Sequence, residues 1–173
     1  MAEDIFTQLS IFQGLTPKQL DQLRPVFYPC NFYTDTIIFN QGDPAEALYI
    51  VVSGEIVVDF KPDDGPLITV ATVHPGSIVG WSAALGSRRY TSSAITTTYS
   101  QLLRLSGCDL KQLCKEYPET GRIFLDHLAL AVADRLKNTH PQILHLLEMG
   151  LQLAPQPEEV EYEKNREQPV RPG

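Results

Sequence analysis

The sequence predicts an α+β fold that is mainly β: an antiparallel sandwich or barrel with helices at both ends. Between residues 26 and 105, short apolar or alternating runs are separated about every eight to twelve residues by turns rich in Gly, Pro and Asp. Before and after this region, apolar residues recur at helical spacing instead. The chain has 173 residues and is 43% hydrophobic, which is enough for one buried core.

The first segment is predicted to be helical. Ile5, Phe6, Leu9, Ile11 and Phe12 follow a roughly helical spacing. A second helix begins at the run 16–19, where Thr is suited to cap it, Pro to occupy its first position and Gln to complete a capping box. The proline at position 25 then ends that helix.

The central region contains seven runs that are typical of strands. They are expected over residues 26–33, 36–39, 48–52, 55–60, 67–73, 91–98 and 101–105. Many short strands joined by Gly- and Pro-rich turns favour antiparallel pairing, because parallel strands need long crossover connections.

Helical spacing returns after residue 105. Ser106 with Asp109 resembles a capping box. A long helix is expected over 118–138, with an apolar stripe at spacings of four residues: Phe124, Leu128, Val132 and Leu136. The run Thr139-His140-Pro141-Gln142 repeats the pattern of a helix start and predicts a separate helix over 139–153. Residues 154–173 are acidic, with five Glu against one Lys and two Arg, and are expected to form a flexible tail. The predicted organisation is therefore a domain over 1–138, an extra helix over 139–153 and a tail over 154–173.

The composition excludes several classes of function. A net charge of −7 argues against a nucleic-acid-binding surface, because neutralising phosphates requires clustered Lys and Arg. The chain has no apolar run of about 18 residues, and its acidic start lacks a signal peptide, so we expect no membrane association. Three cysteines without a CxxC pair predict free thiols and a cytoplasmic location.

No pattern of an enzyme or a metal site is present. The four histidines, at 74, 127, 140 and 145, lie in a turn and in the late helices without a metal-binding spacing. No nucleophile elbow, P-loop or dinucleotide fingerprint occurs. We therefore expect no catalytic residue, no metal and no resident cofactor.

Four turn and strand motifs, at regular distances, resemble the cyclic-nucleotide-binding domain family. The motifs are Phe39-x-Gln41-Gly42-Asp43, Leu48-Tyr49-Ile50-Val51, Ser53-Gly54-Glu55-Ile56 and Val73-His74-Pro75-Gly76. The run 76–94, with its glycines and its Arg-Arg-Tyr-Thr-Ser exit, resembles the phosphate-binding cassette of that family. Over residues 5–138 the resemblance implies a fold like that of catabolite activator protein. This fold is a jelly-roll-like double-stranded β-helix, flanked by N-terminal helices and a long C-terminal helix.

The cassette departs from the family at two positions. The resemblance implies a Glu that binds the ribose hydroxyl and an Arg that binds the phosphate, but Trp81 and Tyr90 occupy those positions. Tryptophan accepts no hydrogen bond, and a tyrosine offers one neutral donor in place of a charged fork. The candidate ligand-binding residues are Gly80, Trp81, Ser82, Ala83, Arg88, Arg89, Tyr90 and Thr91.

Three interpretations of the cassette remain open. It binds an ordinary cyclic nucleotide, or it binds a different small ligand, anionic or aromatic, that stacks on Trp81, or its own Trp81 and Tyr90 fill the pocket. The loss of a charge-assisted contact would weaken the binding of an ordinary cyclic nucleotide.

Two functional classes follow. The first is a non-enzymatic, stand-alone regulatory module that senses a small ligand or acts through a protein partner. The second is a ligand-free scaffold that dimerises or docks through its C-terminal helices. The residues after 138 are too few and too acidic for the DNA-binding domain found in some members of the family, so we expect no DNA binding. A homodimer or partner interface is expected at Phe124, Leu128, Val132 and Leu147, although these residues would also suit packing on the β-roll.

Overall fold

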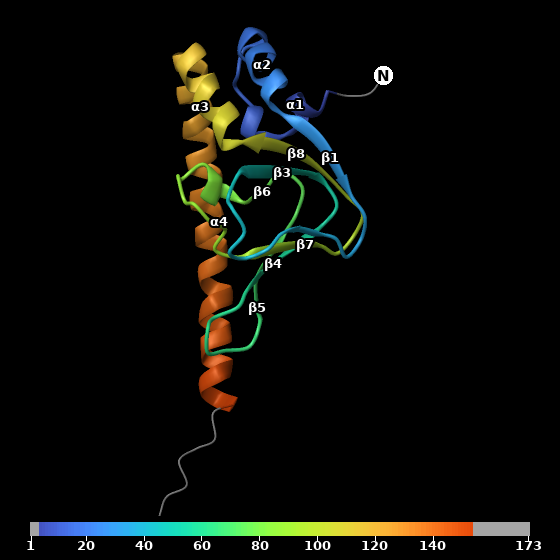
Figure 1. The fold of residues 1–173 in the computed structure, drawn as a ribbon, viewed down its shortest axis with the longest axis vertical. Helices are drawn as coiled ribbons and strands as arrows, with labels where there is room; N and C mark the ends of the chain where they lie inside the picture. Colours follow the sequence, from blue (N-terminus) through green and yellow to red (C-terminus); the bar gives the residue numbers. More distant parts are fainter. Residues whose placement is uncertain (1–3, 154–173) are drawn as a thin grey trace, which may run out of the picture.

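The computed structural model describes residues 4–153, and within them two four-stranded antiparallel sheets form a β-roll beside one long helix (Figure 1). The first sheet has the strand order β1-β8-β3-β6 and the second β2-β7-β4-β5. The strands are β1 (Tyr28–Phe32), β2 (Ile37–Phe39), β3 (Ala47–Ser53), β4 (Ile56–Phe60), β5 (Ile68–Val73), β6 (Ile78–Val79), β7 (Ser93–Thr96) and β8 (Ser100–Ser106). The predicted jelly-roll-like fold is confirmed.

The central strand β3 of the first sheet is buried on both faces, which explains its continuous apolar run from Ala47 to Val52. Ile50 and Leu103 pack into a cluster with the helices, whereas Val51 and Leu102, their neighbours in sequence, pack inside the roll. Successive side chains of a strand point to opposite faces of the sheet. The first sheet therefore separates two cores, one between the sheets and one beneath the helices.

A glycine fixes the turn between β3 and β4. Gly54 has a φ of +92°, a conformation that side-chain-bearing residues rarely adopt. A Cβ at this position would also lie 2.2 Å from Oγ of Ser100. The Ser-Gly turn of the sequence motif therefore requires glycine for both reasons.

The N-terminal helices form where they are expected, but the first segment divides into two short pieces, and the second helix ends two residues before Pro25, which lies in a 3-10 turn. They comprise α1 (Ile5–Gln8), η1 (Ser10–Phe12), α2 (Pro17–Leu23) and η2 (Arg24–Val26). Thr16 and Gln19 form the expected capping box at the start of α2, with Pro17 at its first position. Phe12 and Phe27 pack against Phe124 of the long helix, with ring centroids 6.2 and 5.7 Å from it. This aromatic cluster attaches the N-terminal helices to the C-terminal helix.

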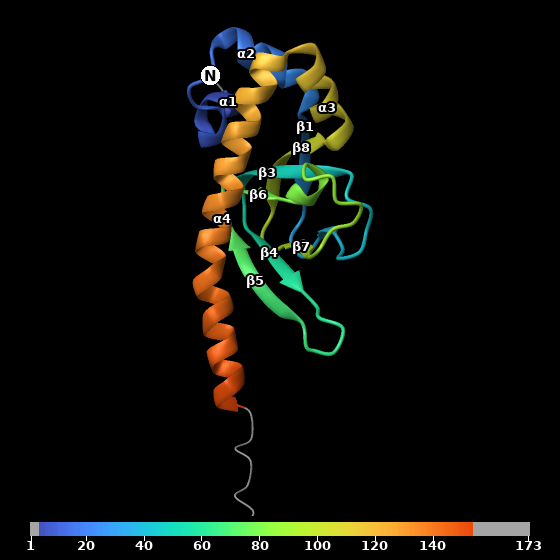
Figure 2. The same cartoon turned by 90° about the vertical axis from the view of Figure 1, so that its left-hand side faces the viewer.

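The C-terminal region is α3 (Gly107–Glu116) followed by α4 (Pro118–Leu153), a single helix of 36 residues (Figure 2). Ser106 caps α3 through the backbone N–H of Asp109, as predicted. The predicted break at residue 139 is wrong, because α4 continues through Pro141. The hydroxyl of Thr139 donates to the carbonyl of Arg135 within the helix, 2.7 Å away, instead of capping a new one. A proline in a helix removes one hydrogen bond but can be accommodated without ending the helix.

The predicted apolar stripe of α4 divides between the core and the surface. Phe124 and Leu128 are 0% and 5% exposed and belong to the helical core, so they have no surface to offer a partner. Leu136 is 58% exposed. A spacing of four residues drifts around a helix of 3.6 residues per turn, so three such steps rotate the face by about 120°. The interface prediction is therefore corrected at Phe124 and Leu128, and of its four residues only Val132 and Leu147 still have surface to offer. The predicted tail, 154–173, lies outside the described residues.

Candidate functional site

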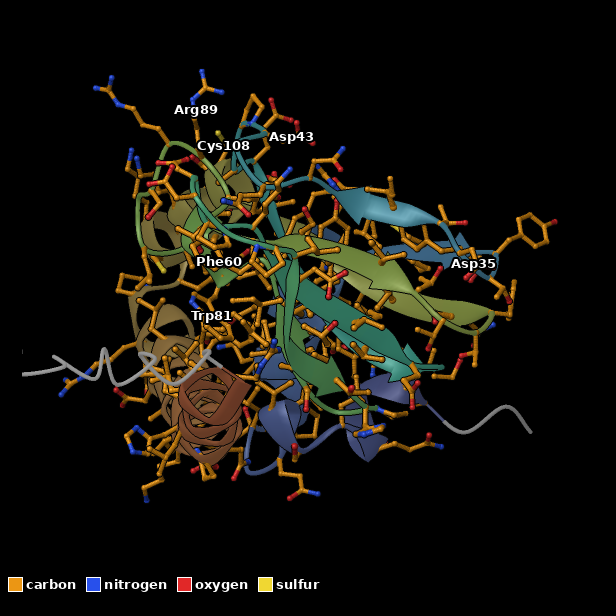
Figure 3. The ribbon with its side chains drawn as sticks, turned by 90° about the horizontal axis from the view of Figure 1, so that it is seen from below. Asp35, Asp43, Phe60, Trp81, Arg89 and Cys108 are labelled. Carbon is orange, nitrogen blue, oxygen red and sulfur yellow. The ribbon has the colours of Figure 1, made fainter. Side chains whose placement is uncertain are left out.

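A cavity of about 310 Å³ lies between the β-roll, the cassette and α4. Figure 3 shows Trp81 and Phe60, two of its lining residues, together between the roll and the helix. Its walls come from β2, β4 and β5 of the roll, from the cassette and from α4. The lining residues are Phe39, Val58, Phe60, Val70, Ala71, Val79, Gly80, Trp81, Ser82, Tyr90, Thr91, Ser92, Arg135, Leu136, Thr139 and Ile143. Most are apolar, and Arg135 is the only charged one among the lining residues that the structure describes.

Gly80 turns the chain from β6 into the cassette. Its φ of +75° is left-handed, and a Cβ would lie 3.0 Å from the carbonyl of Ala47 and 3.2 Å from the Tyr90 ring. The short helix η3 (Trp81–Ala83) follows at once. The glycine thus lets the cassette approach the roll closely enough to close one side of the cavity.

Tyr90 is tied to the roll beneath the cavity. Its hydroxyl donates to the carbonyl of Ala47 at 2.5 Å and accepts from the N–H of the same residue at 3.2 Å. Its ring stacks on Phe39 with centroids 3.9 Å apart. Burial raises the pKa of the Tyr90 phenol above its ordinary value, since the charged form would lose its water. A neutral, hydrogen-bonded tyrosine thus occupies the position where the family pattern has an arginine.

Trp81 forms a stacked pair with Arg135 of α4. The guanidinium carbon lies 5.0 Å from the centroid of the indole. Nη1 of Arg135 also donates to the carbonyl of Ile78 at the start of β6, 2.7 Å away. A cation–π contact contributes about 0.5–1 kcal/mol at exposed sites and about 2 kcal/mol when desolvated. The pair connects the cassette to the middle of α4.

The charge of Arg135 is not balanced within the described residues. None of the ion pairs that they form involves it. Its Nε is buried and lacks a hydrogen-bond partner among these residues. Burial lowers the pKa of the guanidinium to about 10, so the group still carries its charge at neutral pH.

Five of the eight residues predicted for the ligand site line the cavity: Gly80, Trp81, Ser82, Tyr90 and Thr91. The other three lie elsewhere. Ala83 faces the groove beside α3, and Arg88 is exposed. Arg89 is exposed and donates to the carbonyl of Gly42 at 2.6 Å (Figure 3). The structure therefore places both cassette arginines away from the cavity.

Sequence reasoning missed the contribution of α4, namely Arg135, Leu136, Thr139 and Ile143. One signal was available. Arg135 is seven residues after Leu128, so it shares the buried face of the helix, where an unpaired charge is unusual. The prediction used a constant spacing of four residues, which leads from Leu128 to Val132 and Leu136 and does not include Arg135.

Two further observations bound the chemistry. Among the described residues, no group of three or more His, Cys, Asp or Glu side chains is placed to hold a metal ion. Within the same part of the chain, no helix combines the length and the apolarity that crossing a membrane requires.

Comparison with known proteins identifies relatives of this chain. Residues 29–117, just over half of it, match the cyclic nucleotide-binding domain family. A CRP-like cAMP-activated global transcriptional regulator of Mycobacterium tuberculosis is 25% identical over 145 residues, which are 84% of this chain and 63% of that protein. The cAMP-dependent protein kinase regulatory subunit of Dictyostelium discoideum is 27% identical over 65% of this chain and 35% of the relative. A cyclic nucleotide-binding domain from Methylobacillus flagellatus superposes with a TM-score of 0.73 at 21% identity, over 81% of this chain and 79% of that one. The chain thus spans less than two thirds of the length of these two regulatory relatives.

Proposed function

This chain belongs to the cyclic nucleotide-binding domain family, and from that membership we propose that it is a non-enzymatic regulatory module in which a small ligand controls α4. The regulatory fold is shared with the transcriptional regulator and the kinase regulatory subunit. The ligand and the output are specific to this chain and are argued below from its own residues.

The observation that carries the proposal is that one cavity is lined by both the cassette and α4. Trp81 and Thr91 contribute from the cassette, and Arg135 and Thr139 contribute from the helix. A ligand in this cavity contacts both elements at once, so its affinity depends on where α4 lies. By the same linkage, binding shifts the population of α4 positions.

The open cavity favours ligand sensing over a ligand-free scaffold. Tyr90 does not fill the space, because its hydroxyl is bound to Ala47. Trp81 lies against Arg135 at one wall. The remaining volume of about 310 Å³ falls at the lower end of the range of ligand pockets, about 300–1,000 Å³.

The test is a thermal-shift screen of cyclic mononucleotides, cyclic dinucleotides and small aromatic acids and amides, because a ligand that binds only the folded state raises its melting temperature. Hydrogen exchange of α4 is then measured with each hit. We expect at least one hit, and a change in protection around residues 128–143. A screen without any hit would favour the scaffold function, and a hit that leaves exchange of α4 unchanged would contradict control of the helix.

A second proposal concerns assembly, and a specific pattern on α4 supports it. Ala129, Ala133, Leu136, His140, Ile143 and Leu147 are all exposed and alternate in spacings of four and three residues. This is the repeat of a coiled-coil seam, here with one histidine. We propose that two copies pair along this stripe in a symmetric homodimer. Leu136 and Ile143 also line the cavity, so pairing and ligand binding would influence each other.

The output of the module is proposed to be a protein partner and not DNA. The net charge of −7 supports this proposal, since nonspecific attraction to DNA requires a basic surface.

A further inference from the structure

We propose that Arg135 is the anion-binding group of the cavity and that the ligand is a small apolar organic anion, a carboxylate or a phosphate diester, held from α4. This inference rests on the proposed function and names the class of ligand. The cassette arginines do not take this role, since neither Arg88 nor Arg89 lines the cavity.

The first step of the argument is the incomplete environment of Arg135. A guanidinium has five N–H donors in a fixed fork. The contacts recorded for it are one hydrogen bond to Ile78 and the face of Trp81, and the buried Nε is unpartnered among the described residues. A partly buried charge without a counter-ion is unfavourable unless something pairs with it. An anion in the cavity would supply the missing counter-charge. Because Nε is buried, the anion would pair with the Nη groups of the guanidinium.

The second step is the chemistry of the cavity wall. Among the described residues, no acidic side chain lines the cavity. Apart from Arg135 and the indole N–H of Trp81, the polar groups of the lining side chains are the hydroxyls of Ser82, Tyr90, Thr91, Ser92 and Thr139. The hydroxyls of Tyr90 and Thr139 already donate to backbone carbonyls, those of Ala47 and Arg135. A hydroxyl such as that of Ser82, Thr91 or Ser92 can donate its hydrogen to an anion. Phe39, Phe60, Val70 and several other apolar side chains form the rest of the wall. The site therefore selects one negative group attached to a hydrophobic body.

The third step is the alternative that Arg135 is only a structural clamp between α4 and the cassette. The contacts with Trp81 and Ile78 do hold the helix on the roll. Neither contact neutralises the charge of the guanidinium, so a clamp alone leaves the uncompensated charge unexplained. A clamp and an anion site also differ in a measurable way, because only the site distinguishes a charged ligand from its neutral analogue.

The experiment uses calorimetry on the full 173-residue protein with two probes of nearly equal shape. The probes are 1-naphthylacetate, which is anionic, and 1-naphthylacetamide, which is neutral. Cyclic AMP is titrated in parallel, so that the carboxylate and phosphate sources are separated. We expect the carboxylate to bind at least about tenfold more tightly than the amide, as a charge-assisted hydrogen bond would provide.

Two variants and one control locate the effect. Arg135→Met should reduce the preference for the anion to about onefold, since it keeps an unbranched side chain and removes the charge. Lys137→Met, which removes one exposed positive charge from the same helix, should keep the preference of the wild type. Trp81→Glu serves as an independent variant. It would place a carboxylate against the guanidinium, so it should also abolish the preference if Arg135 is the anion site.

The outcomes separate this inference from the proposed function. The inference is overturned if the wild type binds both naphthyl probes with equal affinity. It is also overturned if Arg135→Met keeps the preference for the anion. In both cases the proposal of a ligand-binding module still stands. If the wild type binds cyclic AMP but neither naphthyl probe, and Arg135→Met abolishes this binding, the result supports the anion site with a phosphate as its ligand. If the wild type binds none of these probes but a neutral compound from the thermal-shift screen does bind, the inference fails alone. If that screen finds no ligand of any charge, both proposals fail.

Discussion

The hydroxyl of Tyr90 is hydrogen-bonded to both backbone groups of Ala47, donating to the carbonyl at 2.5 Å and accepting from the N–H at 3.2 Å. Tyr90 follows the cassette and Ala47 begins β3, so one side chain joins the exit of the cassette to the roll. Both residues are buried, at 6% and 1% exposure. The substitution that removes the arginine of the family pattern thus adds a structural anchor.

Tyr90→Phe should lower the free energy of unfolding by about 1–3 kcal/mol, because it leaves a buried N–H and a buried C=O of Ala47 without their partner. Urea denaturation with unchanged m-values would measure the loss. Tyr33→Phe is the matched control, since Tyr33 is 80% exposed, and it should change stability by no more than about 0.5 kcal/mol. Equal stability of Tyr90→Phe and wild type would mean that the two hydrogen bonds to Ala47 do not matter.

The same burial predicts a dependence on alkaline pH. The pKa of Tyr90 is raised above its ordinary value near 10, so its contribution to stability is present below pH 10 and is lost as the pH rises through the folded-state pKa. Absorbance titration should show one of the seven tyrosines ionising late, together with unfolding. Tyr90→Phe should lack this late step. A late step that persists in the variant would assign it to another tyrosine.

Ordinary cyclic nucleotides should bind weakly. At the two positions where the family pattern has Glu and Arg, Trp81 is stacked on Arg135 and Tyr90 is fixed to Ala47. The loss of charge-assisted contacts, each contributing about 1.5–3 kcal/mol, should leave dissociation constants above about 100 μM for cyclic AMP and cyclic GMP. Isothermal calorimetry tests this directly, and a low-micromolar constant for either nucleotide would refute it.

The sequence predicted the roll well because its local signals agree with its tertiary structure. The turn at Gly54 and the cap at Thr16 are each determined by neighbouring residues, and both appear where expected. The helix break predicted at residue 139, two residues before Pro141, is wrong, because a proline weakens a helix locally but does not by itself end it.

The cavity could be predicted only in part from the sequence, because its two walls are far apart in the chain. The cassette wall follows from a contiguous motif, and Gly80, Trp81 and Tyr90 are found there. The sequence places Arg135 on the helix face that carries Leu128, but it does not specify which part of the roll this face meets. Each step of four residues turns the helix face by about 40°, so Leu128 is buried whereas Leu136 is exposed.

Introducing a negative charge on α4 should distinguish the residues needed for folding from those needed for dimerisation. Leu147→Glu should give a folded monomer, because Leu147 is 61% exposed and lies on the proposed seam, where a dimer would bury the new carboxylate. Leu128→Glu should unfold the protein, since Leu128 is 5% exposed. Light scattering at tens of micromolar and circular dichroism distinguish the two results. Leu85→Glu, at a 70% exposed position in the cassette, is the control that should stay dimeric. A wild type that is monomeric under these conditions would contradict the dimer.

The 173-residue chain should not bind duplex DNA. Its net charge of −7 opposes association, and the two adjacent arginines at 88 and 89 are its most basic run. Arg89 already donates to the carbonyl of Gly42, so the pair offers at most a few phosphate contacts. Because each phosphate neutralised contributes to the salt dependence of binding, so small a surface gives neither strong attraction nor a steep salt slope.

Mobility-shift assays at low salt with micromolar protein should show no complex. The matched variant Arg88→Glu with Arg89→Glu should behave in the same way. A sequence-selective, salt-sensitive shift that this double variant abolishes would instead establish a DNA-binding surface at the cassette exit.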